Sequence, residues 1–247
     1  PCLRCHPTPE IPNFRPRTPR RAGAGRGHEP APLPEGLSPP TMSHYLDYAA
    51  TAAVRPASVG RAVAAFLERC GGTPGRGGHR RSVEAGRVAL AARRGVQDLL
   101  GLPGDPGRVA FFQNATHALN AGLHGLLGPG DAVVVSDYDH NAVLRPVEWL
   151  RRSIGVEVRV LSGTPEGEVD LEEAERLLAG ARLLVVNAVS NVLGTALPLP
   201  ALAERARAAG ARILVDTAQA AGHRPLSLRA DGADLVAFTG HKGMLGP

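Results

Sequence analysis

Short apolar runs alternate with longer amphipathic stretches along most of this 247-residue chain. The runs predicted to be strands are 108–113, 132–136, 156–160, 182–187, 212–216 and 234–238. Helices are expected at about 58–70, 82–100, 115–127, 140–153, 170–180 and 199–209, the first with Val59, Val63, Phe66 and Leu67 on one face. Strands that are apolar throughout and separated by helices are typical of a parallel sheet covered on both faces. The sequence therefore predicts an α/β fold with a mostly parallel sheet.

Residues 1–41 differ from the rest of the chain, because they hold 11 of the 22 prolines and few large apolar side chains. Such a segment buries too little surface to offset its ordering entropy, so we predict a disordered Pro/Arg-rich tail followed by one folded domain at 42–247. Met42 directly precedes the first structured motif, which leaves open that translation begins there and that the tail is not native. Within the tail, Cys2, Cys5 and His6 match the pattern for covalent haem attachment, which we interpret as a chance match.

Charge and composition exclude several classes of protein. The net charge is +5, and three of those charges belong to residues 1–41, so the remainder is nearly neutral and no nucleic-acid partner is expected. No apolar run approaches the ~20 residues of a membrane span. Three cysteines without a regular framework favour a reducing, cytoplasmic setting, and no metal site is expected.

Polar residues collect where the predicted strands end, which is where ligands bind in parallel sheets. Asn114 precedes a helix whose first N–H groups favour an anion, although, taken alone, Asn114 is better explained as an ordinary helix cap. Asp216 ends an apolar strand, and a buried carboxylate there needs a cationic partner. Asp139, Asn141 and Ser190 lie in the same strand-end loops. The candidate site residues are Ala115, Thr116, His140, Asn191, Asp216, Gln219, Thr239, His241 and Lys242.

Lys242 is the only lysine, since the other 27 of the 28 basic residues are arginine. Arginine replaces lysine wherever charge alone is needed, but only a lysine amine can be made neutral and nucleophilic. Either Lys242 is a leftover surface charge or it does chemistry that arginine cannot do. An anion site, a carboxylate, a histidine, amides and one lysine together suit pyridoxal 5'-phosphate, which needs a lysine for a Schiff base.

Seven stretches occur in order: "YLDYAATA", "TPGRGGHR", "NATHALN", "DHNAV", "SNVLGT", "VDTAQAAG" and "AFTGHKGMLGP". From about Tyr45 to Pro247 the chain thereby resembles the class V aminotransferase family of pyridoxal phosphate-dependent enzymes, especially its cysteine desulfurase branch. The resemblance implies the large domain of the fold type I transferases and a homodimer with active sites at the interface. It also places Arg76 and His79 near the site, in a glycine-rich loop.

The resemblance implies a role for each candidate residue. Lys242 would form the Schiff base and carry protons, Asp216 would pair with the pyridine nitrogen, and His140 would stack on the ring. Gln219 and Asn191 would contact the ring hydroxyl or the substrate carboxylate. The phosphate would be held by Ala115, Thr116, Thr239 and His241.

Two departures from the family pattern matter. Tyr48 stands where the family often has Asn. The family also continues beyond the lysine motif with a further strand, a small C-terminal domain, an arginine for the substrate carboxylate and, in desulfurases, a nucleophilic cysteine. We expect these to be missing from the 247 residues, so that the chain alone is not a competent catalyst. Cys70 does not match the family's cysteine loop, and we interpret it as a partly buried thiol.

The expected function is that of a pyridoxal phosphate-dependent enzyme acting on an amino acid. A cysteine desulfurase-like enzyme, which cleaves a C–S bond and passes sulfur to an acceptor protein, fits the resemblance first. A class V aminotransferase and a selenocysteine lyase are the alternatives within the enzyme class. A non-catalytic fragment that binds partners, and a nucleic-acid binder that uses the arginine-rich tail, are alternatives of other classes.

Overall fold

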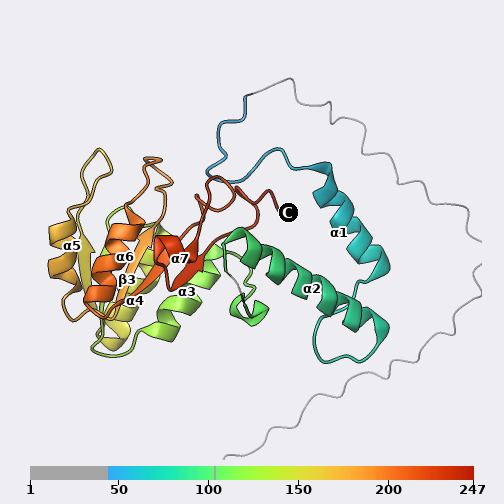
Figure 1. The fold of residues 1–247 in the computed structure, drawn as a ribbon, viewed down its shortest axis with the longest axis horizontal. Coiled ribbons are helices and arrows are strands. Elements are labelled where there is room, and N and C mark those ends of the chain that lie inside the picture. The colour runs from blue at the N-terminus through green and yellow to red at the C-terminus, as the bar shows by residue number, and fades with distance from the viewer. Residues whose placement is uncertain (1–43, 103) are drawn as a thin grey trace, which may run out of the picture. The chain divides into compact units, whose positions relative to one another are not determined.

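The computed structural model describes residues 44–102 and 104–247 (Figure 1). Tyr45–Pro247 form one compact unit. The predicted disordered tail and the Cys2, Cys5 and His6 pattern lie outside the described residues.

Five strands form one parallel sheet in the order β2-β1-β3-β4-β5, as the alternation of strands and helices predicts. The strands are β1 (Ala132–Ser136), β2 (Glu157–Leu161), β3 (Leu183–Asn187), β4 (Arg212–Asp216) and β5 (Leu235–Ala237). The helices are α1 (Ala57–Arg69), α2 (Arg80–Leu99), α3 (Ala115–Leu126), α4 (Asn141–Ile154), α5 (Leu171–Leu178), α6 (Leu199–Ala208) and α7 (Leu228–Asp231), with the 3₁₀-helix η1 at Pro106–Arg108. Sequence patterns located the first six helices within two residues and missed α7 and η1.

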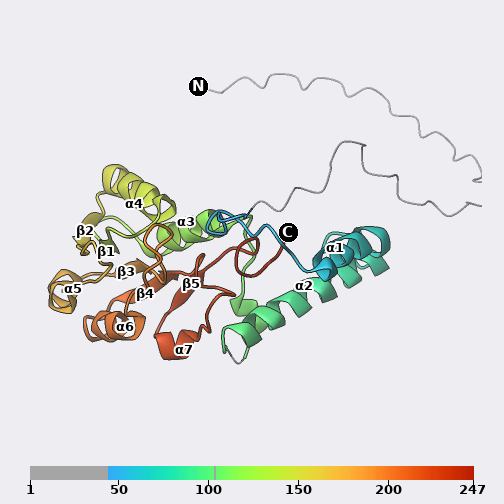
Figure 2. The same ribbon diagram turned by 90° about the horizontal axis from the view of Figure 1, so that it is seen from above.

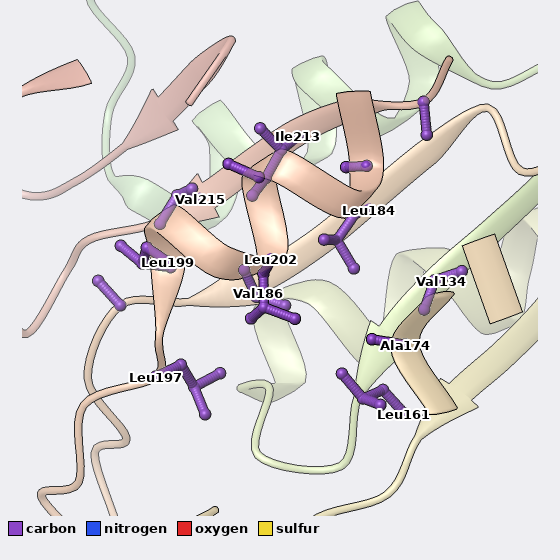
Figure 3. Packing of buried hydrophobic residues seen from close by; sticks show 14 of the residues in the cluster. Val134, Leu161, Ala174, Leu184, Val186, Leu197, Leu199, Leu202, Ile213 and Val215 are labelled. Carbon is purple, nitrogen blue, oxygen red and sulfur yellow. The ribbon is translucent and has the colours of Figure 1, made fainter. Parts of the chain in front are cut away.

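Each face of the sheet has its own apolar core, because successive side chains of a strand point to opposite faces. Figure 2 shows α3 and α4 on one side of the sheet and α5, α6 and α7 on the other. On the α5 and α6 side, Leu184 and Ile213 pack with Leu202 (Figure 3). On the α3 and α4 side, Val185 and Leu214 join the other cluster. Strands β1 and β3 are buried along their whole length, as expected for a sheet that is covered on both faces.

Helix α1 differs from the helices that cover the sheet, because none of its residues is buried. The predicted apolar face is present in the sequence, but Val63 is 41% exposed and Leu67 is 65% exposed. Helix α2 buries few residues, although Leu100, which caps its C-terminal end, belongs to the apolar cluster on the α5 and α6 side of the sheet. Periodicity therefore predicted both helices, but it did not show that the apolar face of α1 is left exposed.

The predicted strand at 108–113 is wrong. Residues 109–112 form no regular element, and Phe111 and Phe112 are 54% and 42% exposed. The guanidinium of Arg93 lies 5.5 Å from the centre of the Phe111 ring, and the Phe112 ring packs edge-on against His117. A strand exists only where another strand pairs with it, and no described strand pairs with this segment.

Among the described residues, no helix is both long and apolar enough to cross a membrane.

Candidate cofactor site

The strand order reverses beside β1, since β2 lies on one side of it and β3 on the other. Ligands bind to open α/β sheets in the crevice at such a reversal, beyond the carboxyl ends of the strands. A cleft of about 410 Å³ lies there, and all nine candidate residues line it: Ala115, Thr116, His140, Asn191, Asp216, Gln219, Thr239, His241 and Lys242. Its remaining lining residues are Asp47, Ala49, Ala50, Asn114, Leu119, Ala142, Asn187, Val189 and Ala218.

The N-terminus of α3 forms one end of the cleft. The side chain of Asn114 accepts a hydrogen bond from the backbone N–H of His117 at 2.8 Å, so Asn114 is a helix cap. The N–H groups of Ala115 and Thr116 belong to the first turn and have no acceptor within the helix. Together with the helix dipole they favour an anion at this end. The cap and the anion site, which the sequence left as alternatives, are therefore compatible.

Asp216 ends β4 at the cleft and is only 6% exposed. One of its oxygens accepts from the backbone N–H of Ala218 at 2.9 Å. Burial raises the pKa of Asp216 above the ordinary aspartate value, whereas that hydrogen bond and the charges of His140 and Lys242 lower it. Asp216 makes no ion pair within the described part of the chain. A cation bound in the cleft would stabilise its charged form.

Lys242 lies in a turn after β5, with its side chain half-buried at the cleft. Two glycines let this turn pack against the turn that follows Asp216. A Cβ on Gly243 would collide with the carbonyl oxygen of Ala221, and a Cβ on Gly222 would collide with that of Gly243. The backbone of Gly222 also has a φ of +84°, which side chains disfavour. The absence of these Cβ atoms therefore lets the backbones of the two turns lie in direct contact.

His140 follows β1 and caps α4. Its Nδ1 accepts from the backbone N–H of Ala142 at 3.1 Å, so a neutral ring carries its proton on Nε2. The imidazole is exposed and lines the cleft. Gln219, which also lines the cleft, donates from Nε2 to the carbonyl of Ala49 at 2.9 Å, and this bond ties residues near the start of the compact unit to the cleft.

Sequence reasoning placed Asp139 in the loop after β1 but did not predict that it is buried. Asp139 is 6% exposed, and its Oδ2 accepts from the backbone N–H of Ser136 at 2.8 Å. Its pKa is raised to about 7: burial raises it most and the nearby charge of Asp216 also raises it, while hydrogen bonds from Ser136 and Asn187 partly lower it. Asn187 ends β3 directly opposite Asp216 in the sheet register. Asp216 was singled out because it is a polar residue at the end of an apolar strand. Asn187 has the same position in β3, so the same signal could have identified it.

Other positions that the sequence singled out lie outside the cleft lining. His79 caps α2 through a 3.3 Å hydrogen bond from the backbone N–H of Ser82, and neither His79 nor Arg76 lines the cleft. Tyr48 is 38% exposed and is absent from the lining. Cys70 is only 2% exposed, and its Sγ donates to the carbonyl of Arg81 at 3.3 Å. Its burial is more complete than the partly buried thiol that was expected.

The parallel sheet, the helix N-terminus and the single lysine beside a buried carboxylate define the class of protein. They are the features of the large domain of fold type I pyridoxal phosphate-dependent enzymes. The chain belongs to the aminotransferase class-V family, whose model matches residues 44–247.

Two relatives are cysteine desulfurases by name. A Pyrococcus abyssi protein described as "Probable cysteine desulfurase" is 34% identical over 206 residues, which is 82% of this chain and 51% of that protein. A cysteine desulfurase of Klebsiella pneumoniae is 36% identical over 208 residues, or 82% of this chain and 50% of that protein. The apo structure of cysteine desulfurase from Thermococcus onnurineus superimposes with a TM-score of 0.76 at 33% identity, covering 81% of this chain and 50% of that one. The chain thus spans about half the length of the relatives it matches.

Proposed function

We propose that this chain binds pyridoxal 5'-phosphate and forms the cofactor-binding part of a cysteine desulfurase-like enzyme. One observation carries the proposal: the nine candidate residues, spread from Ala115 to Lys242 in the sequence, line a single cleft. The named relatives favour desulfuration over transamination, because those described here are cysteine desulfurases.

The residues present fit the cofactor. A phosphate is a dianion, and the first turn of α3 offers free N–H groups at one end of the cleft. A protonated pyridine nitrogen is a cation, and Asp216 is a buried carboxylate with no ion-pair partner among the described residues. An aldehyde needs an amine, and Lys242 lines the same cleft. The phosphate, the pyridine nitrogen and the aldehyde of the cofactor therefore each have a chemical counterpart in the cleft.

Each residue has a distinct task in this proposal. When bound, the cofactor supplies an electron sink for the bonds at the amino acid's Cα. Asp216 keeps the ring nitrogen protonated, because its buried charge is stabilised by a cation. Lys242 provides the amine that holds the cofactor and afterwards carries a proton at Nζ. His140, with its proton on Nε2, contributes a flat ring beside the cofactor.

We infer that the substrate is an amino acid, cysteine foremost, and that the sulfur passes to an acceptor protein. Cys70 is buried and does not line the cleft, so it does not serve as the sulfur carrier. The thiol that receives sulfur comes from outside residues 44–102 and 104–247. We further infer a cytoplasmic homodimer, in line with the family resemblance and the cysteine content.

Replacement of Lys242 by Arg tests the cofactor assignment, because the charge is kept and the nucleophilic amine is lost. The purified protein should show the visible absorbance band of lysine-attached pyridoxal phosphate, and Lys242→Arg should abolish it with an unchanged circular dichroism spectrum. Adding Arg61→Lys, which restores one lysine on the exposed surface of α1, should not restore the band. A band that survives in Lys242→Arg would refute the assignment.

The reaction is tested separately from cofactor binding. Residues 1–247 alone are expected to release no sulfide from cysteine. A version of the protein that also carries the acceptor thiol and the substrate-binding arginine should, with a thiol reductant present, release sulfide and alanine in equal amounts. Formation of an oxo acid without sulfide would instead assign a transaminase. Binding of the cofactor with neither product would make the chain a binding domain only.

A further inference from the structure

Residues 51–55 contact the turn that carries Lys242. The carbonyl of His241, which is the peptide oxygen directly before Lys242, faces three donors from this segment. The backbone N–H of Ala52 lies 3.0 Å from it, the hydroxyl of Thr51 lies 3.1 Å from it, and Nη2 of Arg55 lies 3.5 Å from it. The peptide that precedes the lysine is therefore fixed by residues about 190 positions away in the sequence.

Arg55 binds both ends of the turn that carries Lys242, residues 240–246, which is called the lysine turn below. Its Nε donates to the carbonyl of Gly246 at 2.7 Å, and its Nη2 reaches back toward His241. The turn also closes on itself, since the N–H of Gly246 donates to the carbonyl of Gly240 at 2.7 Å. Leu245 has a φ of +56°, which is a strained conformation for a side-chain-bearing residue. A turn of this kind keeps its shape only where its surroundings hold it.

The Thr51 hydroxyl completes the connection. It donates to the His241 carbonyl, and it accepts from Nη2 of Arg55 at 3.1 Å. Nδ1 of His241 lies 3.0 Å from the same hydroxyl oxygen, which fixes the orientation of the imidazole at the cleft. One arginine and one threonine thus hold the backbone before Lys242 and the side chain of its neighbour.

Arg55 contacts the turn that carries Lys242 from outside the cleft. It does not line the cleft, and it makes no ion pair among the residues the structure describes. Its donors go to two backbone carbonyls and one hydroxyl, all neutral. A planar fork of donors suits this geometry, whereas the ammonium group of a lysine would be a single point donor.

We propose that Arg55 is a positioning residue that sets the reach of the Lys242 amine into the cleft. The turn contains Gly240 and Gly243, so its backbone has little stiffness of its own. Covalent attachment depends steeply on where the amine lies, because a displacement of about 1 Å can change a rate by about 100-fold. This inference rests on the proposed function, in which Lys242 condenses with the cofactor aldehyde and one water molecule leaves.

The test separates covalent attachment from binding. Arg55→Met removes the donors and keeps the apolar stem, Arg55→Lys keeps the charge, and Arg61→Met is the matched control on the exposed surface of α1. Attachment is followed by the visible band and by borohydride trapping at Lys242. Binding is followed with pyridoxine 5'-phosphate, which carries an alcohol in place of the aldehyde and cannot attach. Amide hydrogen exchange of 240–246 without any ligand reports the turn itself.

Arg55→Met should slow attachment about tenfold or more, while affinity for pyridoxine 5'-phosphate changes less than about twofold. Exchange at 240–246 should become faster, Arg55→Lys should recover part of both losses, and Arg61→Met should match wild type. Attachment at the wild-type rate, or an equal loss of attachment and alcohol binding, would overturn the proposal. If Arg55→Met fails to fold, Thr51→Val decides the question, with a smaller effect expected in the same direction.

Failure of the proposed function gives a different result. Wild-type protein would then attach no pyridoxal phosphate at Lys242, and exchange at 240–246 alone would decide the role of Arg55. Unchanged exchange in Arg55→Met would overturn that role as well, and faster exchange would support it as a feature of the fold.

Discussion

Strands β1 and β3 and helix α1 all carry apolar residues but bury them to opposite extents. Strands β1 and β3 are buried at every position, whereas α1 has no buried residue. The strands face helices on both sides, and α1 has no comparable surface to pack against in the described chain. The difference shows that an apolar pattern specifies an element, while burial depends on what the remainder of the chain places beside it.

The contrast also explains where the site lies. Most residues that line the cleft sit at the ends of buried strands or at the starts of the helices that cover the sheet, so packing fixes their positions. Regions with few buried contacts open more readily than the core. The cleft thus depends on the well-packed region, with one exception, the segment 47–55 that precedes α1 and reaches the lysine turn.

The largest predicted effect compares one leucine from each region. Leu184→Ala removes a fully buried side chain from β3 and should lower the free energy of unfolding by about 2–5 kcal/mol. Leu67→Ala in α1 is the matched control, and because this side chain is 65% exposed, its effect should stay within about 0.5 kcal/mol. Urea denaturation followed by circular dichroism measures both. Equal losses would mean that α1 is packed in solution and would remove the contrast.

A second prediction concerns the buried carboxyl of Asp139, whose pKa is raised to about 7 in the folded protein. An unfolded chain ionises this group near pH 4, so folding stability is highest below that pH and falls as the pH rises to about 7. Asp139→Asn keeps an oxygen for the Ser136 N–H and cannot ionise. Relative to this variant, wild type should lose on the order of 2–4 kcal/mol between pH 4 and pH 7, and no more above pH 7.

The measurement for Asp139 is urea denaturation at several pH values. Asp216 also has a raised pKa, but it is present in both proteins, so the difference between them reports Asp139. A difference that stays constant across this range would show that Asp139 remains ionised when buried, with a cation beside it.

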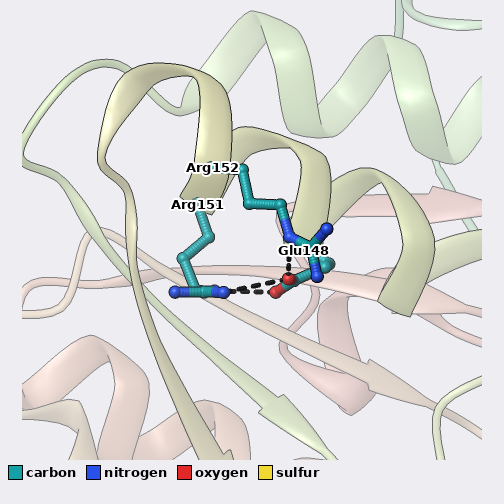
Figure 4. Close-up of polar contacts among 3 residues, drawn as sticks. All are labelled: Glu148, Arg151 and Arg152. Carbon is teal, nitrogen blue, oxygen red and sulfur yellow. Dashed lines mark hydrogen bonds and ion pairs between the residues drawn. The ribbon is translucent and has the colours of Figure 1, made fainter.

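The smallest effect is expected on the surface of α4. Glu148 accepts hydrogen bonds from Arg151 and Arg152 (Figure 4), and these two arginines lower its pKa to about 2. The group is exposed, and exposed ion pairs contribute little because water and salt screen them. Glu148→Gln should therefore shift the melting temperature only slightly, and added salt should remove the shift.

The pH range provides a check on Glu148. Because the folded-state pKa is lowered, its contribution is present above pH 4.5 and should vanish as the pH falls toward 2. A loss as large as that of Leu184→Ala would show that this part of α4 is covered in solution.

Local sequence signals were sufficient for much of the fold. Apolar runs flanked by turn residues located five strands, and the ends of these strands together with the start of α3 located the nine candidate residues that line the cleft. The run at 108–113 failed because strand formation depends on a pairing partner, which sequence composition does not reveal. Asp139 was noticed as a loop residue, but its burial follows from the packing of neighbouring strands. The bonds from Arg55 to the lysine turn join residues far apart in the sequence, and no local pattern announces them.

The link between Thr51 and His241 has a consequence for the order of events during synthesis. The two residues are 190 positions apart. A ribosome adds about 5–20 residues per second, so the early segment waits roughly 10–40 seconds before its partner is made. Throughout that interval the sheet can assemble strand by strand, yet the turn that carries Lys242 does not exist. A nascent chain halted before His241 would accordingly possess most of the cleft and still be unable to capture a cofactor aldehyde.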